Sequence, residues 1–479
     1  MQHFQQVLQL KVIMQAPYAP CVLGLDLGTS SVKVVLLDAV SRAVVHSQTQ
    51  ETKAEVSSPD GEQAREQDVG KIVSALHYCI AAMPKEHLRR VTRIGVSGQM
   101  HGVMMWKGQE GCKWQMSEAG LTFQPVETSH LVTWQDGRCN HEFLATLPQP
   151  DSHLNLATGF GCATIFWYMK NRPQVLQTYN VAGTIHDYVV AALCGHDKPL
   201  MSAHNAASWG YFNTKSGTWN LQILKDSGFP ICWLPTIMES GKIAGKTTHE
   251  WCGVPEGAEV GVAMGDFQCS VYSCMSEKTD AVLNISTSAQ LTFALPPTFQ
   301  PPDHPNPNSS VAYFPYLDGI YLAVAAALNG GNIMSSFVGM LKQWMHEFGL
   351  EVPETIIYCQ TINSALNVDQ TDLGVQATIF GERHLPGQLG SITNISPSNL
   401  SLGQMTRALC RGIIENLQAM LPCQRLVESG VRRIVGSGSA LTRNQVLRQE
   451  LEKIFTLPIV YKETADSAVG VALVMIDRK

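Results

Sequence analysis

The clearest alternation of apolar and polar positions along the chain lies between residues 22 and 38. Two apolar runs flank a polar turn that carries Asp26, Gly28, Thr29 and Ser30. Short runs of this composition on either side of a turn predict two adjacent strands. Backbone amides at the turn could bind a phosphate, because glycine lets an anion approach closely. The same residue types also favour an ordinary hairpin turn, so the local pattern leaves both interpretations open.

Other periodicities predict further elements. Apolar residues spaced three and four apart predict helices over residues 68–83 and 404–421. Short apolar runs predict strands at residues 91–96 and 433–435, and each of these strands enters a glycine-containing loop. The proline-rich stretch 296–310 predicts a surface loop, because proline suits neither a helix interior nor a central strand.

The order of these elements occurs twice along the chain. A second hairpin pattern includes Asn284, which takes the place of Asp26, and it too is followed by a helix, a strand and a glycine loop. The same dipeptide, Arg-Ile, also occurs in both of the later strands, at Arg93 and at Arg433. The sequence therefore predicts two related α/β lobes, although such units also recur by chance in large α/β proteins. Glycine and proline between residues 253 and 261 indicate the boundary between the lobes.

Composition limits the class of protein. A chain of 479 residues with 45% hydrophobic residues is long enough for two or three domains. With 34 basic and 40 acidic residues the formal charge is −6 and no basic run stands out, so we expect no nucleic acid partner. No apolar stretch reaches the ~20 residues that span a bilayer, so we expect no membrane association. No feature of the sequence indicates an obligate protein partner.

Cysteine usage and the first residues bear on location. The 13 cysteines are scattered without C-x-x-C pairs, which is typical of free thiols in a reducing compartment. Residues 1–20 carry a lysine and lack a small-residue cleavage site, so we expect a loose N-terminal extension rather than a secretory signal. We therefore predict a cytoplasmic protein.

Asp266 is the candidate for proton transfer. It follows an apolar run that begins at Gly261, and a predicted helix comes after it. A carboxylate there could accept the proton of a sugar hydroxyl as the hydroxyl oxygen attacks phosphorus. An aspartate between a strand and a helix is also a common N-cap, and the local sequence alone favours that role.

Two segments are candidates for sugar contacts. Gln99, Met100 and His101 lie in a glycine-bracketed loop after a predicted strand, where α/β folds place ligands. The segment 134–138 joins Trp134 to Asp136 and Arg138, and aromatic rings stack on sugars while charged pairs bind hydroxyl groups. A surface turn with an incidental ion pair, and a histidine satisfied within its loop, are the structural alternatives.

Small residues at 436–440 offer a surface against which a flat ring such as adenine could lie, with Asn444 available to bind it. A strand-to-helix turn needs similar residues, so the pattern alone does not decide. Glycine turns at 329–331 and 381–383 add to a cleft without identifying its ligand. The chain contains neither a Walker A motif nor a G-x-G-x-x-G at the start of a βαβ unit, so a phosphate site would be of another kind.

Taken in order, these motifs resemble those of the FGGY carbohydrate kinases, which belong to the superfamily of actin, sugar kinases and heat-shock ATPases. The resemblance covers roughly residues 21 to 475. Segment 26–33 is similar to the family's first phosphate motif, 285–290 to the second and 436–444 to the adenosine motif, while 97–102 and 134–138 resemble sugar-contacting segments of its ketose kinases. Asp266 falls at the place of the catalytic base. The chain departs from many relatives at Ser286 and Ser437, where glycine is usual, and in having Phe267 directly after Asp266, with the amide one residue later at Gln268.

The resemblance implies an α/β fold of two ribonuclease H-like (actin-like ATPase) lobes around a central cleft. We expect residues 1–20 to be an extension, 21–255 to form the N-terminal lobe on the sugar side, and 256–479 to form the C-terminal lobe on the nucleotide side. The implied reaction is transfer of the γ-phosphoryl group of ATP, with Mg²⁺, to the terminal hydroxyl of a small ketose of seven carbons. Pentuloses such as xylulose and ribulose, or glycerol, remain alternative substrates, and a non-catalytic sugar or nucleotide sensor is an alternative function. A chaperone-like ATPase would need a peptide-binding domain for which the chain has no spare length.

The expected site residues follow from the motifs and the resemblance together. Asp266 is the expected catalytic base, and Asp26, at the end of the first predicted strand, is the expected Mg²⁺ ligand. The expected nucleotide-binding residues are Gly28, Thr29, Ser30, Lys33, Thr287, Ser288, Gly330, Gly331, Gly436, Ser437, Gly438 and Asn444. The expected substrate-binding residues are Gln99, Met100, His101, Asp136, Arg138, Asp266 and Gln268.

Overall fold

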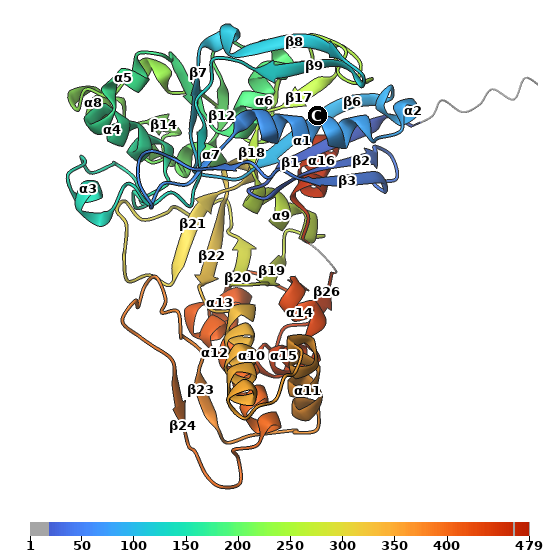
Figure 1. Cartoon of the computed structure of the whole chain (residues 1–479), viewed down its shortest axis with the longest axis vertical. Coiled ribbons are helices and arrows are strands. Elements are labelled where there is room, and N and C mark those ends of the chain that lie inside the picture. Colours follow the sequence, from blue (N-terminus) through green and yellow to red (C-terminus); the bar gives the residue numbers. More distant parts are fainter. Residues whose placement is uncertain (1–18, 463–464, 479) are drawn as a thin grey trace, which may run out of the picture.

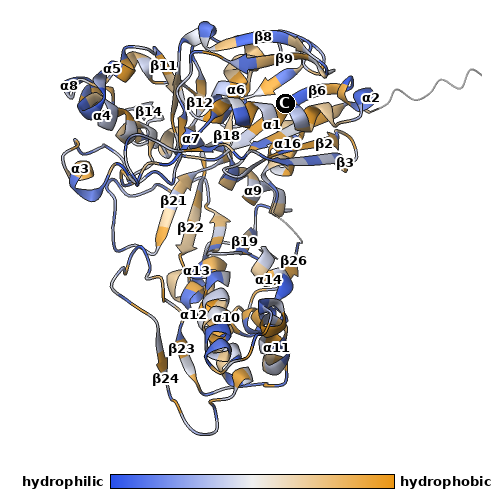
Figure 2. Ribbon diagram, viewed as in Figure 1, coloured by the Kyte–Doolittle hydropathy of each residue, from blue (hydrophilic) through white to orange (hydrophobic). Residues whose placement is uncertain are grey.

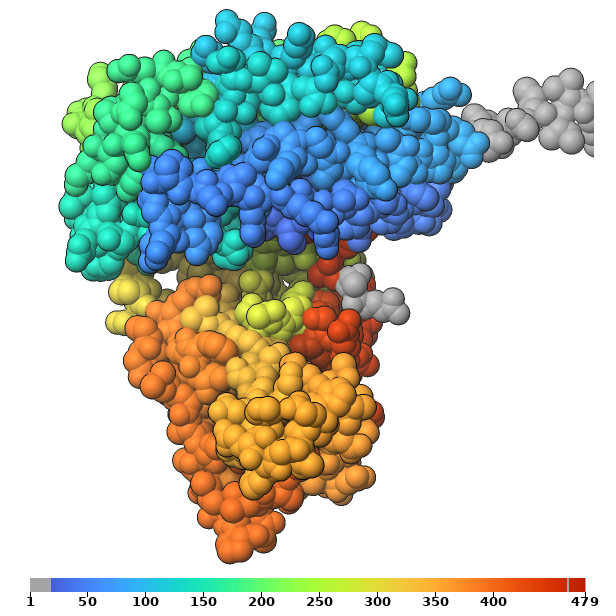
Figure 3. Space-filling view, viewed as in Figure 1, coloured from blue at the N-terminus to red at the C-terminus, as the bar shows by residue number. Residues whose placement is uncertain are grey.

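The protein folds into two α/β lobes, one above the other in Figure 1. The computed structural model describes residues 19–462 and 465–478. The predicted extension 1–20 therefore lies, except for its last two residues, outside the described part of the chain. The two lobes meet at a narrower waist (Figure 3).

The first lobe is built on a seven-stranded sheet with the order β16-β17-β6-β1-β2-β3, in which β18 also pairs with β6. Strand β1 pairs antiparallel with β2 and parallel with β6, so the predicted first hairpin forms. The strands are β1 (Cys21–Leu27), β2 (Ser31–Asp38), β3 (Val44–Glu51), β6 (Val91–Gly98), β16 (Ile243–Lys246), β17 (Glu259–Gly261) and β18 (Met264–Gly265).

The second lobe is built on a six-stranded sheet with the order β21-β22-β20-β19-β25-β26. The strands are β19 (Asp280–Ile285), β20 (Ala289–Ala294), β21 (Val311–Pro315), β22 (Tyr321–Ala327), β25 (Arg433–Ser437) and β26 (Ile459–Tyr461). The predicted proline-rich loop joins β20 to β21. Strands β21 and β22 are largely hydrophobic in Figure 2, as expected for a sheet that is covered on both faces.

The internal duplication is confirmed by the pairing of the strands. In the first sheet β1 pairs antiparallel with β2 and parallel with β6. In the second sheet β19 pairs in the same way, antiparallel with β20 and parallel with β25. Asp26 lies opposite Ser97 in the first sheet, and Asn284 lies opposite Ser437 in the second. Both serine hydroxyls donate to the carbonyl of the residue before the Asp or Asn, at 3.1 Å in the first lobe and 3.5 Å in the second.

Helices cover the faces of both sheets. In the first lobe α1 (Val69–Ala81) packs on β2 and β3, and α6 (Ile185–Cys194) packs on β6. In the second lobe α10 (Gly331–Glu347), α11 (Glu354–Leu366), α12 (Leu402–Met420) and α15 (Gln445–Ile454) pack together, with α12 against the sheet. The helices predicted over 68–83 and 404–421 are thus confirmed as α1 and α12.

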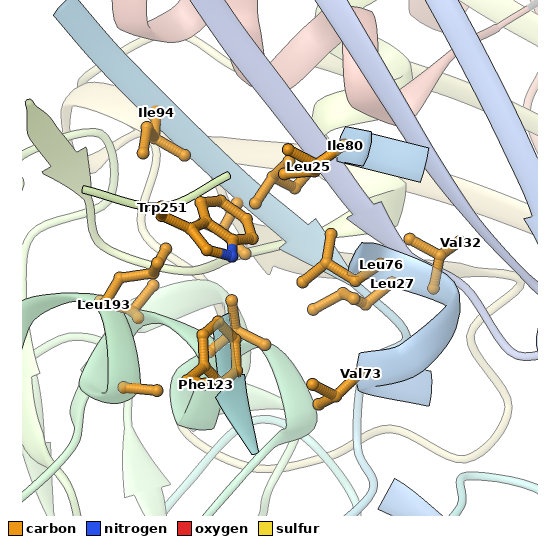
Figure 4. Close-up of a cluster of buried hydrophobic side chains, with 14 of the residues drawn as sticks. Leu25, Leu27, Val32, Val73, Leu76, Ile80, Ile94, Phe123, Leu193 and Trp251 are labelled. Atoms are coloured by element: carbon orange, nitrogen blue, oxygen red, sulfur yellow. The ribbon is translucent and has the colours of Figure 1, made fainter. Parts of the chain in front are cut away.

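The core of the first lobe lies between the sheet and α1. Figure 4 shows Leu25 and Leu27 of β1 meeting Leu76 and Ile80 of α1, with Trp251 closing the cluster from a distant part of the chain. These side chains are completely buried. Burial of side chains of this size contributes about 1.5–3 kcal/mol each, so this contact fixes β1 and the turn that follows it.

Two helices lie between the sheets. Helix α9 (Asp266–Cys274) follows β18, and α16 (Ser467–Asp477) follows β26; the two pack on each other, and α16 packs on β1, β2 and β6. The contact is close because Gly24 of β1 and Gly95 of β6 leave no room for a Cβ atom beside the backbone of α16. A buried cluster joins these helices to residues of both sheets.

The predicted boundary between residues 255 and 256 is corrected by this arrangement. Strands β17 and β18 lie beyond that boundary, yet they pair parallel with β6 in the first sheet. Helix α16 also returns to the first sheet after the whole second lobe. The glycine and proline signal near residue 255 marks a turn within the first lobe, because Trp251 and Val254 form a bridge there.

Smaller elements complete the first lobe. Its outer part, between residues 103 and 237, has its own hydrophobic cluster. The remaining helices of the lobe are α2 (Lys85–Leu88), α3 (His141–Ala145), α4 (Gly161–Asn171), α5 (Pro173–Leu176), α7 (Ala203–Ala207) and α8 (Leu221–Asp226). Its short strands are β4 (Glu55–Val56), β5 (Glu66–Gln67), β7 (Met104–Trp106), β8 (Cys112–Ser117), β9 (Gly120–Pro125), β10 (Leu131–Val132), β11 (Val181–Gly183), β12 (Leu200–Ser202), β13 (Phe212–Asn213), β14 (Thr218–Trp219) and β15 (Thr236–Met238).

The second lobe has fewer additions, namely β23 (Gly374–Gln376), β24 (Ser391–Thr393), α13 (Cys423–Glu428) and α14 (Ser439–Arg443). All 13 cysteines are free, as predicted. Among the described residues, no helix is both long enough and apolar enough to cross a bilayer.

Candidate active site

Asp26 lies at the end of β1, directly before the turn formed by residues 28–30. The Ser97 hydroxyl lies 3.0 Å from the Asp26 carboxylate and shares its single proton between this carboxylate and the Leu25 carbonyl. Burial raises the pKa of Asp26 above its ordinary value, and repulsion from Asp466 adds to this. Because burial disfavours the ionised form of this carboxylate, a nearby cation would stabilise it.

The first turn is held from outside by two side chains. Gln67 donates to the carbonyl oxygen of Thr29 at 2.6 Å, and the Trp134 indole N–H donates to the Thr29 hydroxyl at 3.0 Å. The segment predicted to stack on a sugar therefore places its aromatic residue at the first turn. Because its N–H is engaged there, Trp134 supports the shape of the turn and connects it to the segment 134–138.

Asp266 is the first residue of α9 and follows β18 at the edge of β6. Gly265 occupies the N-cap position, so Asp266 does not have the capping role that local sequence favoured. Its Oδ1 accepts the backbone N–H of Phe267 at 2.7 Å. Burial raises the pKa of Asp266, and repulsion from the Asp26 carboxylate adds to this effect. A carboxylate with a raised pKa is well suited to accept a proton.

The second turn, formed by residues 286–288, meets two glycine segments that are far away in the sequence. The backbone N–H of Gly331 donates to the Ser286 carbonyl at 2.8 Å, and that of Asn332 donates to the Thr287 carbonyl at 3.0 Å. The Ser286 hydroxyl accepts the N–H of Ser439 at 3.4 Å. Thr287 and Ser288 remain exposed at the turn.

Gly438 gives a testable prediction for this arrangement. Its φ of 101° favours glycine, and a Cβ atom at this position would collide with the backbone carbonyl of Ile285. We expect Gly438→Ala to displace the second turn and to lower ATP affinity by about tenfold or more, since strain of this kind costs about 1–3 kcal/mol. Calorimetric titration with ATP measures the change. Gly430→Ala is the matched control, because Gly430 has a φ of 86° but open space around its Cβ position. Equal ATP affinity in both variants would contradict the prediction.

Two residues predicted to bind adenine are engaged inside the second lobe. Ser437 is completely buried within β25. Asn444 caps α15 by accepting the Leu447 N–H at 3.1 Å, and its amide donates to the Cys410 sulfur at 3.4 Å. The prediction that the Ser437 side chain contacts a nucleotide is therefore corrected, because that side chain is completely buried. Asn444 uses its oxygen and one N–H on internal partners, and its contact with a nucleotide stays a prediction.

Two buried glutamines mark the side of the site expected to bind sugar. Gln99 donates to Gln67 at 2.9 Å, and Gln268 donates to the carbonyl of Pro315 at 3.3 Å. Among the described residues, neither side-chain carbonyl oxygen has a hydrogen-bond partner. The Gln268 oxygen lies beside Gly265 and Met100. An unpaired buried acceptor costs about 1–3 kcal/mol, and a hydroxyl-rich ligand would supply donors.

His101 is held firmly in the loop after β6. Its Nδ1 lies 3.0 Å from the carbonyl oxygen of Ser208, and its ring stacks on Phe160 at 4.7 Å between centroids. Burial lowers the pKa of His101, so the neutral ring is favoured. The backbone of His101 has a φ of 75°, which is unusual for a residue other than glycine and is consistent with a loop shaped for a ligand.

Asp136 and Arg138 form a buried ion-pair network rather than an open sugar site. The Arg138 side chain is only 1% exposed and contacts Asp136 at 2.9 Å, Asp60 at 3.0 Å and Glu66 at 2.6 Å. The other Asp136 oxygen accepts the backbone N–H of Arg65 at 2.8 Å. The prediction that these two side chains contact the sugar directly is corrected, because their polar atoms are engaged internally.

Asp466 is a further residue of the candidate site, outside the motifs of the sequence. The Lys33 ammonium, predicted to bind nucleotide, forms an ion pair with the Asp466 carboxylate at the start of α16. The Asp466 side chain also caps this helix by accepting the Val469 N–H at 3.0 Å. An aspartate before an apolar helical run is an N-cap signal that the sequence does contain, but only the fold brings it to the β1–β2 hairpin.

The duplicated fold, its two hydroxyl-rich turns and the carboxylates Asp26 and Asp266 define a class of protein. Residues 21–272 match the model of the FGGY family of carbohydrate kinases, N-terminal domain. The chain belongs to this family and is therefore a carbohydrate kinase. A kinase of this family uses ATP, so a nucleotide and a sugar must both bind.

Individual relatives and a solved structure resemble the chain to different degrees. The chain is 57% identical to sedoheptulokinase from Homo sapiens over 469 residues, which cover 96% of this chain and 98% of the relative. It is 27% identical to xylulose kinase from Escherichia coli (strain K12) over 56% of this chain and 52% of that relative. The fold is similar to the crystal structure of xylulose kinase from Rhodospirillum rubrum, with a TM-score of 0.77, 19% identity and coverage of 95% of this chain and 89% of the other.

Proposed function

We propose that this carbohydrate kinase transfers the γ-phosphoryl group of ATP to the terminal hydroxyl of sedoheptulose and forms sedoheptulose 7-phosphate. The observation that carries the proposal is Asp266 itself, a buried carboxylate whose pKa is raised by burial and by Asp26, on the same helix as Gln268, whose buried side-chain oxygen has no hydrogen-bond partner among the described residues. The choice of sugar is supported by the 57% identity to human sedoheptulokinase over nearly the whole of both chains.

The residues support direct transfer between the two substrates. A sugar hydroxyl near Asp266 gives up its proton to the carboxylate as its oxygen forms a bond to the γ-phosphorus, while the bond from that phosphorus to the bridging oxygen of ADP breaks. The turns at residues 28–30 and 286–288 would hold phosphate oxygens through backbone N–H groups and hydroxyls. Gln99 and Gln268 would accept hydrogen bonds from other sugar hydroxyls and so fix the orientation of the acceptor.

Asp26 is the residue that would hold Mg²⁺. A carboxylate oxygen suits this hard cation, and bound Mg²⁺ neutralises charge on the transferring phosphate. Among the described residues, no group of three or more His, Cys, Asp or Glu side chains is arranged to hold a metal. One or two carboxylates combined with substrate phosphates are the usual way to bind Mg²⁺ in kinases, so the single carboxylate of Asp26 fits.

Asp26→Asn is expected to raise the Mg²⁺ concentration needed for half-maximal rate by about tenfold or more, because a charge-assisted contact is worth about 1.5–3 kcal/mol. Initial rates at fixed ATP over a Mg²⁺ series measure this. Asp38→Asn is the matched control at the other end of the hairpin, where Asp38 accepts from Val40 at 3.0 Å and Ser41 at 2.8 Å and an asparagine can do the same. An unchanged Mg²⁺ requirement in Asp26→Asn would remove Asp26 from the metal site.

The substrate is tested by ADP release with a panel of acceptors. We expect sedoheptulose to give the highest kcat/KM among sedoheptulose, xylulose, ribulose, a hexulose and glycerol, and we expect slow ATP hydrolysis without sugar, since closed kinase sites exclude water. A higher kcat/KM for a pentulose or for glycerol would contradict the choice of sugar. Binding of ATP without ADP release for any acceptor would favour a non-catalytic sensor instead.

A further inference from the structure

The start of α16 connects three parts of the candidate active site. Asp466 precedes the helix, and its carboxylate forms an ion pair with Lys33 on β2. The same carboxylate caps α16 through the Val469 N–H, while the backbone N–H of Asp466 donates to the Ser273 hydroxyl on α9 at 3.0 Å. Contacts with α16 and α9 therefore fix the position of Asp466 independently of its ion pair with Lys33.

The next residue extends this connection to the candidate base. The Ser467 hydroxyl donates to the backbone carbonyl of Asp266 at 3.0 Å. Consecutive residues of one helix terminus thus contact the β1–β2 hairpin and the first residue of α9. A shift of α16 would move both contacts together.

The Lys33 ammonium is oriented by its ion pair with Asp466. It faces Asp26 across the β1–β2 pair, close to the first turn. Lysine carries its charge on a flexible stem, and its ammonium has three N–H donors. An ion pair through one donor leaves two for phosphate oxygens. The Asp466 side chain is only 12% exposed, so solvent screens this pair less than a surface pair.

We propose that Asp466 is a positioning residue that holds the Lys33 ammonium toward the phosphates of ATP. The inference rests on the proposed function in that ATP is the nucleotide bound at the first turn. Asp466 does not contact ATP itself; it acts through Lys33, whose freedom of movement it restricts.

Asp466→Asn separates this role from helix capping, because asparagine caps a helix as well as aspartate but lacks the charge that attracts Lys33. We expect Asp466→Asn to weaken ATP binding, measured by calorimetric titration without sugar, by about tenfold, the value of one charge-assisted contact. We expect the same fold-change in kcat/KM for ATP and an unchanged Tm. Lys33→Met should have an effect at least as large, and the double variant should bind ATP no more weakly than Lys33→Met alone.

Asp477→Asn is the matched control at the other end of the same helix. Asp477 pairs with Arg42 and accepts from the Tyr272 hydroxyl at 2.6 Å, so the control removes a comparable charge away from the first turn. We expect its ATP affinity to equal that of the unsubstituted protein. Asp466→Ala, which removes the cap as well, should lower Tm and so show how much of any effect comes from the helix.

Two results would overturn the proposal. One is an Asp466→Asn variant with unchanged ATP affinity, and the other is a double variant in which the two separate effects multiply. Failure of the proposed function would look different: the unsubstituted protein would bind ATP, with the dependence on Asp466 intact, but would not release ADP with sedoheptulose. The calorimetric readout therefore tests Asp466 independently of the sugar.

Discussion

Asp266→Asn is expected to lower kcat by a factor of about 10² to 10⁴, the usual contribution of a positioned general base. Asparagine has nearly the same shape and can still accept the Phe267 N–H, but it cannot take the proton of the attacking hydroxyl. Affinity for ATP should change little, because the turns assigned to the phosphates lie on other elements. Steady-state rates with sedoheptulose, together with calorimetric titration of ATP, measure the two quantities separately.

The control for this variant is Asp226→Asn at the exposed end of α8, where the carboxylate accepts only from Gln222 among the described residues, at 2.7 Å. It should leave both kcat and Tm unchanged. Near-normal turnover of Asp266→Asn would exclude Asp266 as the base. A loss of turnover accompanied by a large fall in Tm would instead assign Asp266 a structural role.

Arg138→Met is expected to lower the free energy of unfolding by about 3–5 kcal/mol, because it removes the one buried guanidinium that pairs with all three carboxylates of the cluster. Asp60, Asp136 and Glu66 all pair with Arg138, and their side chains are at most 7% exposed. Although burial opposes ionisation of Glu66, its hydrogen bond with Arg138 holds the pKa below the ordinary value. Methionine preserves much of the volume, so the charge is the main change. Urea denaturation measures the loss.

Arg172→Met is the matched control for this prediction. Arg172 also pairs with Asp60, at 2.9 Å, but its side chain is 42% exposed, so its loss should cost about 0–1 kcal/mol. If Arg138 instead bound the sugar directly, Arg138→Met would raise KM for the sugar and leave stability almost unchanged. That outcome would contradict the structural role assigned to the network.

Local sequence was sufficient to predict the elements whose signals are local. The helix predicted over 68–83 forms as α1 (Val69–Ala81), with Asp68 as its N-cap accepting from Lys71. The hairpins on either side of residues 28–30 and 286–288 form because each combines two apolar runs with a polar turn. The duplication could be predicted for the same reason, since Asp26 and Asn284 hold equivalent positions in two hairpins of the same pattern.

The features that were missed depend on contacts distant in the sequence. The apolar run that begins at Gly261 indicates a strand, but nothing in its composition reveals that β17 and β18 pair with β6 in the first sheet. Arg138 looks like a surface residue until Asp60 and Glu66, from an earlier segment, surround it. At Asn444, in contrast, the local sequence indicates the observed role. An asparagine before a helix is commonly an N-cap, and the Asn444 side chain caps α15.

The return of α16 to the first sheet has a consequence for the order in which the protein can be completed during synthesis. The face of β1 and β6 that carries Gly24 and Gly95 is covered by a helix that the ribosome makes only after the entire second lobe. Until then this part of the sheet is exposed to chaperones and proteases. A fragment ending at residue 272, although it contains the whole family match, would keep that face uncovered. The first lobe is thus completed only after the second lobe has been synthesised, although each lobe has its own sheet.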